Sequence, residues 1–189
     1  MPVVTVRLLE GYDASVREAL MRRITRAVRA TIAAPLEGTT VVIDEVAPAS
    51  YMRGGVAARA PGKALPDATA AVREFLKAME ARDLAGACVH LASGFAMTLP
   101  GGVRLDSLEA LVDWARPRYR FAKKRYERFD EAPDEETTVV YCFGTLSGEW
   151  SDGSTFEGIR FIDRFTVKEG KLVDQMVWND LGEARAKPR

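Results

Sequence analysis

The sequence has few of the residues that bind metals or form disulfides: its 189 residues include two cysteines and one histidine. Cys88 and Cys142 lie far apart and form no CxxC pattern, and His90 has no second histidine to join it. Zinc and haem sites need several such side chains, and disulfide-stabilised domains need several cysteines. We therefore expect no metal site, no cofactor and no disulfide framework, and the unpaired cysteines indicate a reducing, cytoplasmic location.

The chain also has no excess of charge, because 27 basic and 27 acidic residues cancel. A strong basic excess draws proteins to nucleic acid or to anionic lipid, so we expect neither as a partner. The sequence contains no run of about 18 apolar residues that would predict a membrane-spanning helix. No signal peptide is indicated either, because Arg7 and Glu10 interrupt the first apolar segment.

Aromatic residues are scarce in the first third of the chain. Residues 1–60 contain only Tyr12 and Tyr51, whereas all eight Phe and all three Trp lie beyond residue 66. The two regions therefore have different kinds of core, and the stretch between them is rich in Gly, Ala and Pro, as linkers are. The predicted boundaries are a first domain at 1–55, a linker at 56–66, a second domain at 67–184 and a tail at 185–189.

The first domain has the pattern of a βαβ unit. Residues 3–9 and 39–46 are rich in β-branched side chains and predict two strands. Apolar residues repeat at every fourth position between them, which predicts an amphipathic helix with Asp13 as its N-cap. These apolar positions are Val16, Leu20, Ile24 and Val28. The short crossover makes the strands parallel, and so small a sheet leaves one face bare, so we expect a homo-oligomer, a dimer or larger.

Pro2 stands directly before the first predicted strand. If Met1 is removed, Pro2 becomes a secondary amine at the chain terminus and can accept and donate a proton. A base that works near neutral pH needs a lowered pKa, and desolvation or nearby cations such as Arg7 and Arg53 would lower the pKa of this amine. If Met1 is retained, Pro2 is only the first residue of a strand. The sequence leaves both interpretations open.

Four short segments of the first domain match a known pattern. They are PVVTVRLLEG at 2–11, APL at 34–36, VVIDE at 41–45 and YMRGG at 51–55. Together they resemble the 4-oxalocrotonate tautomerase family. The resemblance implies small βαβ subunits that use an N-terminal proline, exposed after removal of Met, as a general acid or base on keto and enol acids. It therefore implies a catalytic role for Pro2.

Two positions depart from the best-known members of that family. In those members an arginine follows the Leu-Glu-Gly turn and another begins the second strand, and both hold substrate carboxylates. Tyr12 and Thr40 occupy these places in this chain, so a dicarboxylate is not the expected substrate. Arg7 or Arg53 is expected to bind a single carboxylate instead. Tyr12 is expected to donate a hydrogen bond to a developing enolate, and Tyr51 matches the family's late aromatic residue.

The second domain begins with helices and ends with strands. We expect helices from Asp67, from Asp83 to Leu91 and over 106–114, the last with an Asp106–Glu109 capping box. Long strands are predicted at 119–129, 137–150, 155–167 and 171–178, with hairpin turns joining the last three.

Three segments of the second domain carry a second resemblance: GTLSGEW at 144–150, DGSTFEGIRFIDRF at 152–165 and GKLVDQMVWND at 170–180. With the three preceding helices they resemble the nuclear transport factor 2 (NTF2) superfamily, in its ketosteroid isomerase-like and SnoaL-like branch. The resemblance implies a cone in which a curved antiparallel sheet wraps three helices around an apolar, ligand-binding cavity. The expected fold class is therefore α+β, a small βαβ tautomerase-like unit followed by this cone-shaped barrel.

Two aspartates fall on otherwise apolar faces when the last strands are given a two-residue period. Asp163 shares a face with Phe161 and Phe165, and Asp180 is expected to share one with residues 172, 174, 176 and 178. A carboxylate on such a face either pairs with a cation or has a raised pKa, as a general acid or base would. Both are therefore candidate catalytic residues. The alternatives are an arginine partner such as Arg160 or Arg164 for Asp163, and a capping or interface role for Asp180.

Three other residues of the second domain are candidates for ligand binding. They are His90, the only histidine, and the aromatic residues Tyr141 and Trp178. The alternatives are a partly buried structural role for His90, and a place in the core or the cavity wall for the two aromatic residues.

The sequence as a whole predicts a proline-based tautomerase or isomerase of a small keto or enol acid, fused to a domain that binds a small molecule. One alternative is a cofactor-free isomerase, dehydratase or hydrolase that acts on an apolar metabolite in the cone. Another alternative is a ligand-binding or assembly module without turnover.

Overall fold

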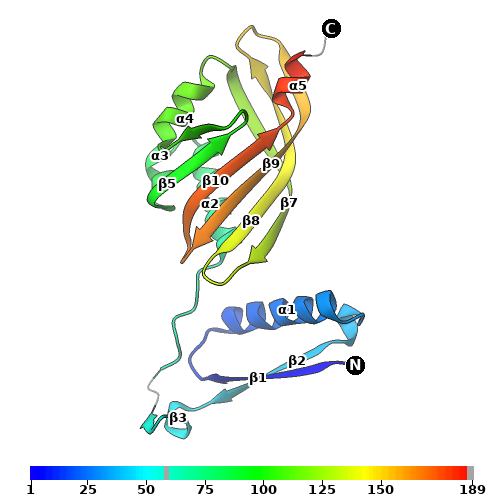
Figure 1. The fold of residues 1–189 in the computed structure, drawn as a ribbon, viewed down its shortest axis with the longest axis vertical. Coiled ribbons are helices and arrows are strands. Elements are labelled where there is room, and N and C mark those ends of the chain that lie inside the picture. Colours follow the sequence, from blue (N-terminus) through cyan, green and yellow to red (C-terminus); the bar gives the residue numbers. More distant parts are fainter. Residues whose placement is uncertain (58–59, 187–189) are drawn as a thin grey trace. The chain divides into compact units, whose positions relative to one another are not determined.

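The chain forms two units in a computed structural model that describes residues 1–57 and 60–186 (Figure 1). Residues 58–59 of the expected linker and 187–189 of the expected tail lie outside the described residues. We call the two units unit 1, Met1–Ala64, and unit 2, Leu65–Arg189.

Unit 1 contains the expected βαβ arrangement. Its elements are β1 (Val3–Leu9), α1 (Ala14–Thr31), the short 3-10 helix η1 (Leu36–Gly38) and β2 (Thr40–Val46). The two strands are parallel, in register from Val3 opposite Thr40 to Leu9 opposite Val46. A second 3-10 helix, η2 (Pro48–Ser50), and a small antiparallel hairpin of β3 (Met52–Arg53) and β4 (Val56–Ala57) follow. Gly54 and Gly55 form the hairpin turn at positive φ, which glycine adopts at little cost.

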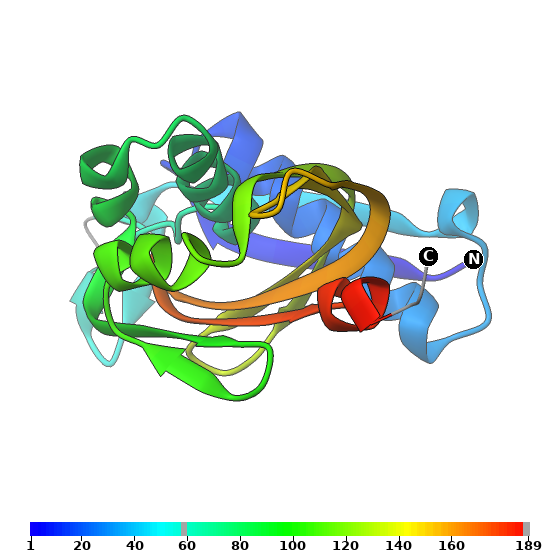
Figure 2. The same cartoon turned by 90° about the horizontal axis from the view of Figure 1, so that it is seen from above.

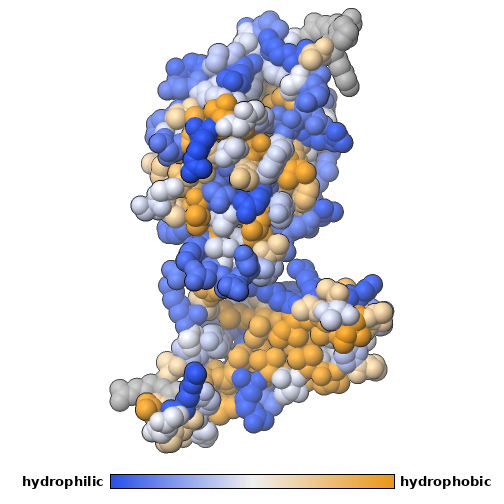
Figure 3. Space-filling model, in the orientation of Figure 1, coloured by the Kyte–Doolittle hydropathy of each residue, from blue (hydrophilic) through white to orange (hydrophobic). Residues whose placement is uncertain are grey.

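Unit 1 has almost no core within a single copy. Among its described residues only Ala34 is buried, and the 18-residue helix α1 buries none of its side chains completely. Val3 and Val42 lie on the sheet face opposite α1 and remain 64% and 41% exposed. Figure 3 shows a broad apolar area on this unit. An apolar surface of this kind marks a place where another protein surface packs.

Unit 2 is built on one long, curved sheet with helices on its concave side (Figures 1 and 2). These helices are α2 (Ala68–Glu80), α3 (Leu84–Cys88) and α4 (Leu108–Ala115), and a short C-terminal helix, α5 (Leu181–Ala186), follows the last strand. The strands are β5 (Leu91–Leu99), β6 (Val103–Leu105), β7 (Tyr119–Pro133), β8 (Thr138–Trp150), β9 (Thr155–Lys168) and β10 (Lys171–Asn179). The strand order is β6-β5-β10-β9-β8-β7, antiparallel throughout except for the parallel pair β5–β10.

The core of unit 2 lies between α2 and the inner face of the sheet. Phe75 of α2 is buried against Phe95 of β5 and Phe165 of β9, with ring centroids 6.4 and 5.9 Å away. Asp67 caps α2 by accepting a hydrogen bond from the Ala70 backbone N–H at 2.8 Å, which satisfies one of the free amides of the first turn. Buried aromatic packing and capping therefore fix α2 on the sheet.

Two helix boundaries in unit 2 differ from the sequence-based expectation. The N-cap of α4 is Ser107, whose hydroxyl accepts from the Ala110 N–H at 3.2 Å, and not Asp106. The helix expected to reach Leu91 ends at Cys88, because Leu91 begins β5.

The expectation that Leu172, Asp174 and Trp178 share one face of the last strand is wrong, because β10 contains a β-bulge. The register shifts between Leu172 and Asp174, so Leu172 and Gln175 are the residues buried on the inner face. Asp174 and Trp178 therefore lie on the opposite, outer face, where Trp178 is 51% exposed. One extra residue in a bulge reverses the alternation that a two-residue period assumes.

Candidate functional site

Pro2 stands at the start of β1, where the second strand holds it in place. Its carbonyl oxygen accepts a hydrogen bond from the Thr40 backbone N–H at 3.0 Å. Met1 is 94% exposed. Removal of Met1 would therefore expose the proline nitrogen at the end of the sheet with little loss of buried surface.

The other candidate residues of unit 1 lie at the opposite end of its sheet. Tyr12 follows the end of β1, and Tyr51 and Arg53 follow the end of β2, which runs parallel to β1. The seven residues of β1 span about 23 Å at roughly 3.3 Å per residue. Figure 1 shows the N-terminus and β3 at opposite ends of the two strands. One copy of unit 1 therefore does not bring Pro2 together with these three side chains.

Contacts within unit 1 hold Tyr12 in place, whereas Arg53 is exposed in the small hairpin. Arg17 of α1 donates hydrogen bonds to the Tyr12 carbonyl and, at 3.0 Å, to Glu45 of β2. Arg7 lies in the middle of β1 and pairs with Asp44 at 3.5 Å. Arg53 and Tyr51 are exposed in and beside the hairpin.

Asp163 lies on the inner face of unit 2 and is completely buried. Its Oδ2 accepts a hydrogen bond from the ammonium of Lys124 on β7, two strands away, and a longer one from Gln175 Nε2 at 3.4 Å. Its Oδ1 has no hydrogen-bond partner among the described residues. The partner of this carboxylate is thus a lysine, and neither Arg160 nor Arg164 reaches it.

Those two arginines pair with carboxylates of the outer face. Arg164 Nη1 lies 2.9 Å from Asp174 Oδ1, and Arg160 Nε lies 2.7 Å from Asp180 Oδ2. Asp180 also begins the C-terminal helix, because its carbonyl accepts from the Ala184 N–H at 2.9 Å. The structure therefore places Asp180 in a surface ion pair at a helix start, away from Asp163.

Tyr141 and His90 are two further candidates of unit 2. Tyr141 stacks on Phe143 on the outer face of β8, with ring centroids 6.5 Å apart. His90 lies between α3 and β5, where its carbonyl accepts from the Leu172 N–H at 2.9 Å. Of the aspartate and aromatic candidates in unit 2, only Asp163 lies on the inner face of the sheet.

Lys124 and Tyr126 were not among the expected site residues, although both face the same interior. They alternate along β7 on the face that meets Leu146 and Gly144 of β8. Burial and the nearby Asp163 carboxylate raise the pKa of the Tyr126 phenol far above its usual value, so the phenol stays protonated. The two-residue period of YRFAKKRYERF places Lys124 and Tyr126 on one face of the strand. The charge of Lys124, however, is typical of an exposed position.

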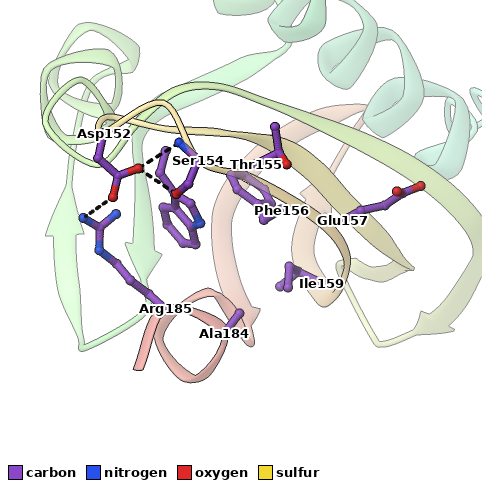
Figure 4. Close-up of a pocket in the computed structure, with 9 residues that line it drawn as sticks. Asp152, Ser154, Thr155, Phe156, Glu157, Ile159, Ala184 and Arg185 are labelled. Carbon is purple, nitrogen blue, oxygen red and sulfur yellow. Dashed lines mark hydrogen bonds and ion pairs between the residues drawn. The ribbon is translucent and has the colours of Figure 1, made fainter. Parts of the chain in front are cut away.

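A surface hollow of about 450 Å³ lies between the β8–β9 turn and α5 (Figure 4). Asp152 accepts hydrogen bonds from the Ser154 backbone N–H and hydroxyl at 2.9 and 2.6 Å, and pairs with Arg185 at 3.7 Å. The Arg185 guanidinium carbon lies 4.9 Å from the ring centroid of Trp150, which lines the hollow. Arg185 thus covers the Trp150 ring within the hollow. None of the site residues expected from the sequence lines this hollow.

The described residues contain no group of three or more side chains that could hold a metal ion. None of the helices in the described part of the chain is long and apolar enough to cross a membrane.

The fold and these sites define a two-unit protein in which a βαβ unit precedes an α+β cone, and comparisons identify the first unit. A family model described as tautomerase enzyme matches residues 2–60. The chain is 42% identical over 55 residues to a probable tautomerase of Bacillus cereus, a match that covers 29% of this chain and 90% of that relative. It is 32% identical over 63 residues to the 2-hydroxymuconate tautomerase of Stutzerimonas stutzeri, covering 33% of this chain and all of that relative. The chain therefore belongs, through unit 1, to the tautomerase family.

The second unit has the NTF2-like fold. An NTF2-like protein of unknown function from Burkholderia pseudomallei superposes with a TM-score of 0.56 at 18% sequence identity, covering 64% of this chain and 95% of that structure. The expected α+β combination of a tautomerase unit and an NTF2-like unit is thus confirmed.

Proposed function

We propose that unit 1 interconverts the enol and keto forms of a small oxo acid, with Pro2 as the acid–base group after removal of Met1. The observation that carries this proposal is the place of Pro2, at the head of β1 in a βαβ unit that matches the tautomerase family over residues 2–60. One relative, the 2-hydroxymuconate tautomerase, is named for an enol acid.

The chemistry needs one group that carries a proton between two atoms of the substrate. The unprotonated Pro2 nitrogen removes the proton of the enol hydroxyl, and the carbonyl forms as the electron pair of the double bond moves to carbon. That carbon then takes a proton from the protonated amine, which returns Pro2 to its starting state. Tyr12 would donate a hydrogen bond to the substrate oxygen as its charge changes, and Arg53 would hold the carboxylate.

These groups meet only if unit 1 assembles with further copies of itself. Within one copy the full length of β1 separates Pro2 from Tyr12 and Arg53. In the proposed homo-oligomer, the Pro2 end of one copy lies beside the Tyr12 and Arg53 end of another. The same assembly would cover Val3 and Val42, which are exposed on the bare sheet face.

The proposed substrate carries one carboxylate. Tyr12 and Thr40 stand where the best-known members of the family have the two arginines that hold a dicarboxylate. Of the two candidate arginines, Arg53 is at the same end of the sheet as Tyr12, whereas Arg7 is paired with Asp44. Acid–base chemistry by Asp163 or Asp180 has less support, because each carboxylate forms an ion pair, Asp163 with Lys124 and Asp180 with Arg160.

The test begins with the intact mass of the purified chain, which is expected to show that Met1 has been removed. Ketonisation of the phenylpyruvate enol and of 2-hydroxymuconate is then compared in wild type, Pro2→Ala and, as a control, Pro133→Ala at the end of β7 in unit 2. Pro2→Ala should lower the rate by about 10²–10⁴-fold, the usual contribution of a general acid–base group. Phenylpyruvate should be the better substrate. A retained Met1, or equal rates for wild type and Pro2→Ala, would refute the proposal.

A further inference from the structure

Three aromatic side chains form a row on the inner face of the unit 2 sheet. Tyr126 lies between Phe129 and Phe161, with ring centroids 5.6 and 5.8 Å from its own. We call these three residues the aromatic row. Tyr126 and Phe129 belong to β7, and Phe161 belongs to β9, which is two strands away.

Gly144 of β8 allows the rings of Tyr126 and Phe161 to meet. It is paired with Tyr126 on one side and with Phe161 on the other. A Cβ atom at this position would lie 3.0 Å from a ring carbon of Phe161 and 2.0 Å from the Arg125 carbonyl oxygen. The glycine therefore leaves the space in which the two rings approach across the middle strand.

A cation stands over each end of the aromatic row. The guanidinium carbon of Arg73, on α2, lies 3.7 Å from the ring centroid of Phe129. The ammonium nitrogen of Lys124 lies 4.6 Å from the ring centroid of Phe161. Both positive charges act on the buried thiol of Cys142, where they oppose the rise in its pKa that burial causes. Arg73 and Lys124 therefore face the same inner surface.

Both cations have hydrogen-bonding capacity left for a ligand. Asp163 binds the Lys124 ammonium from the buried side, but 26% of the lysine side chain is exposed and its other N–H groups are not used by Asp163. Arg73 is exposed, and in the described part of the chain no carboxylate lies within ion-pair distance of it. Phe161 is only 2% exposed, but Tyr126 and Phe129 are half-buried, so a molecule would reach the row from solvent at these two rings.

We propose that this surface binds the anion of a flat, aromatic organic acid. The ring of the ligand would pack on the aromatic row, and its carboxylate or enolate oxygens would be bound by Lys124 and Arg73. An uncharged apolar metabolite would leave both cations unused, and inorganic phosphate would leave the rings unused. Asp163 is a positioning residue in this site, because it holds Lys124 over Phe161. The proposal is independent of the tautomerase chemistry of unit 1.

The test measures binding to the full-length chain of 2-naphthoate and of 2-naphthalenemethanol, which has the same rings without the charge. Calorimetry should show clearly tighter binding of the naphthoate. Lys124→Met and Arg73→Met should each weaken its binding roughly tenfold, as expected for loss of one charge-assisted hydrogen bond. The matched controls are Lys123→Met, next to Lys124 on the other face of β7, and Lys77→Met, about one turn from Arg73 on α2. Both controls should bind as wild type does.

A second variant separates ligand binding from folding. Lys124→Met alone leaves a buried carboxylate without its cation, which can destabilise the unit. In Lys124→Met/Asp163→Asn both charges are removed and the side chains keep their size, so the chain should fold and still bind naphthoate about tenfold more weakly. Equal binding of the two probes, equal binding by the Lys123 and Lys124 variants, wild-type affinity in the double variant, or no binding at all would overturn the proposal.

Discussion

The two units reach stability in different ways. Unit 2 encloses a core in one copy: its 13-residue helix α2 buries four side chains, and its sheet surrounds a continuous apolar cluster. Unit 1 has a longer helix, α1, with no buried side chain, and Val3 and Val42 are exposed on the uncovered face of its two-stranded sheet. Small units bury a smaller fraction of their surface on folding and are therefore less stable alone. We therefore expect unit 2 to fold within one chain and the proposed homo-oligomer to complete unit 1.

The proposed sites follow the same division. The aromatic row and its two cations come together within one copy of unit 2, through neighbouring strands and α2. In unit 1 the strand β1 separates Pro2 from Tyr12 and Arg53. Assembly should therefore be required for catalysis in unit 1 and should have no effect on ligand binding in unit 2.

The largest expected effect is on the core of unit 2. Phe75→Ala removes a ring that is almost completely buried between Phe95 and Phe165, and should lower the free energy of unfolding by about 3–5 kcal/mol. Urea unfolding can be followed by tryptophan fluorescence, because all three Trp residues lie in unit 2. The control, Phe121→Ala, changes a 41% exposed side chain and should cost much less. A midpoint that varied with protein concentration would argue against a core contained in one copy.

A substitution on the bare face of unit 1 should break its assembly. Val42→Asp places a charge on the face that other copies are expected to cover, where burial of even an uncharged, unpaired polar group costs about 1–3 kcal/mol. The variant should have a smaller molar mass by light scattering and should lose tautomerase activity. Val89→Asp is the control, because Val89 is an equally apolar, 60% exposed residue of unit 2. Unchanged mass and activity in Val42→Asp would mean that this face is not an interface.

Helix capping offers a smaller comparison of the two units. The Asp67 side chain caps α2 with a hydrogen bond to Ala70, whereas Asp13, at the N-cap position of α1, makes no such bond. Asp67→Ala should therefore destabilise unit 2 by about 1 kcal/mol, and Asp13→Ala should leave unit 1 nearly unchanged. Chemical unfolding of both variants checks the difference, and equal effects would show that the two caps are equivalent.

Local sequence patterns predicted most of the fold, because they depend on neighbouring residues. The apolar repeat located α1, and β-branched runs located the parallel strands of unit 1. The bulge between Leu172 and Asp174 was not predictable from alternation, so Trp178 was expected on the face of Leu172 and lies on the other one. One extra residue, which no local sequence pattern marks, moved the side chains after it to the other face of the sheet.

The sites were harder to predict because their partners come from distant segments. Alternation placed Asp163 on an apolar face, and the structure buries it there. Its partner Lys124 is 39 residues earlier and two strands away, a contact that depends on the order of strands in the sheet. In unit 1, Arg53 was expected near Pro2, whereas β1 separates the two within one copy.

Complementation between two inactive chains tests most directly whether the unit 1 site is shared between copies. Full-length Pro2→Ala and Arg53→Ala chains, with different tags, are co-expressed, and mixed oligomers are purified on both tags. Each variant alone should have little ketonisation activity, and the mixed oligomers should regain activity, because some sites then combine an intact Pro2 with an intact Arg53 from another copy. Mixed oligomers no more active than the two separate variants would contradict a shared site and would place both groups within one copy.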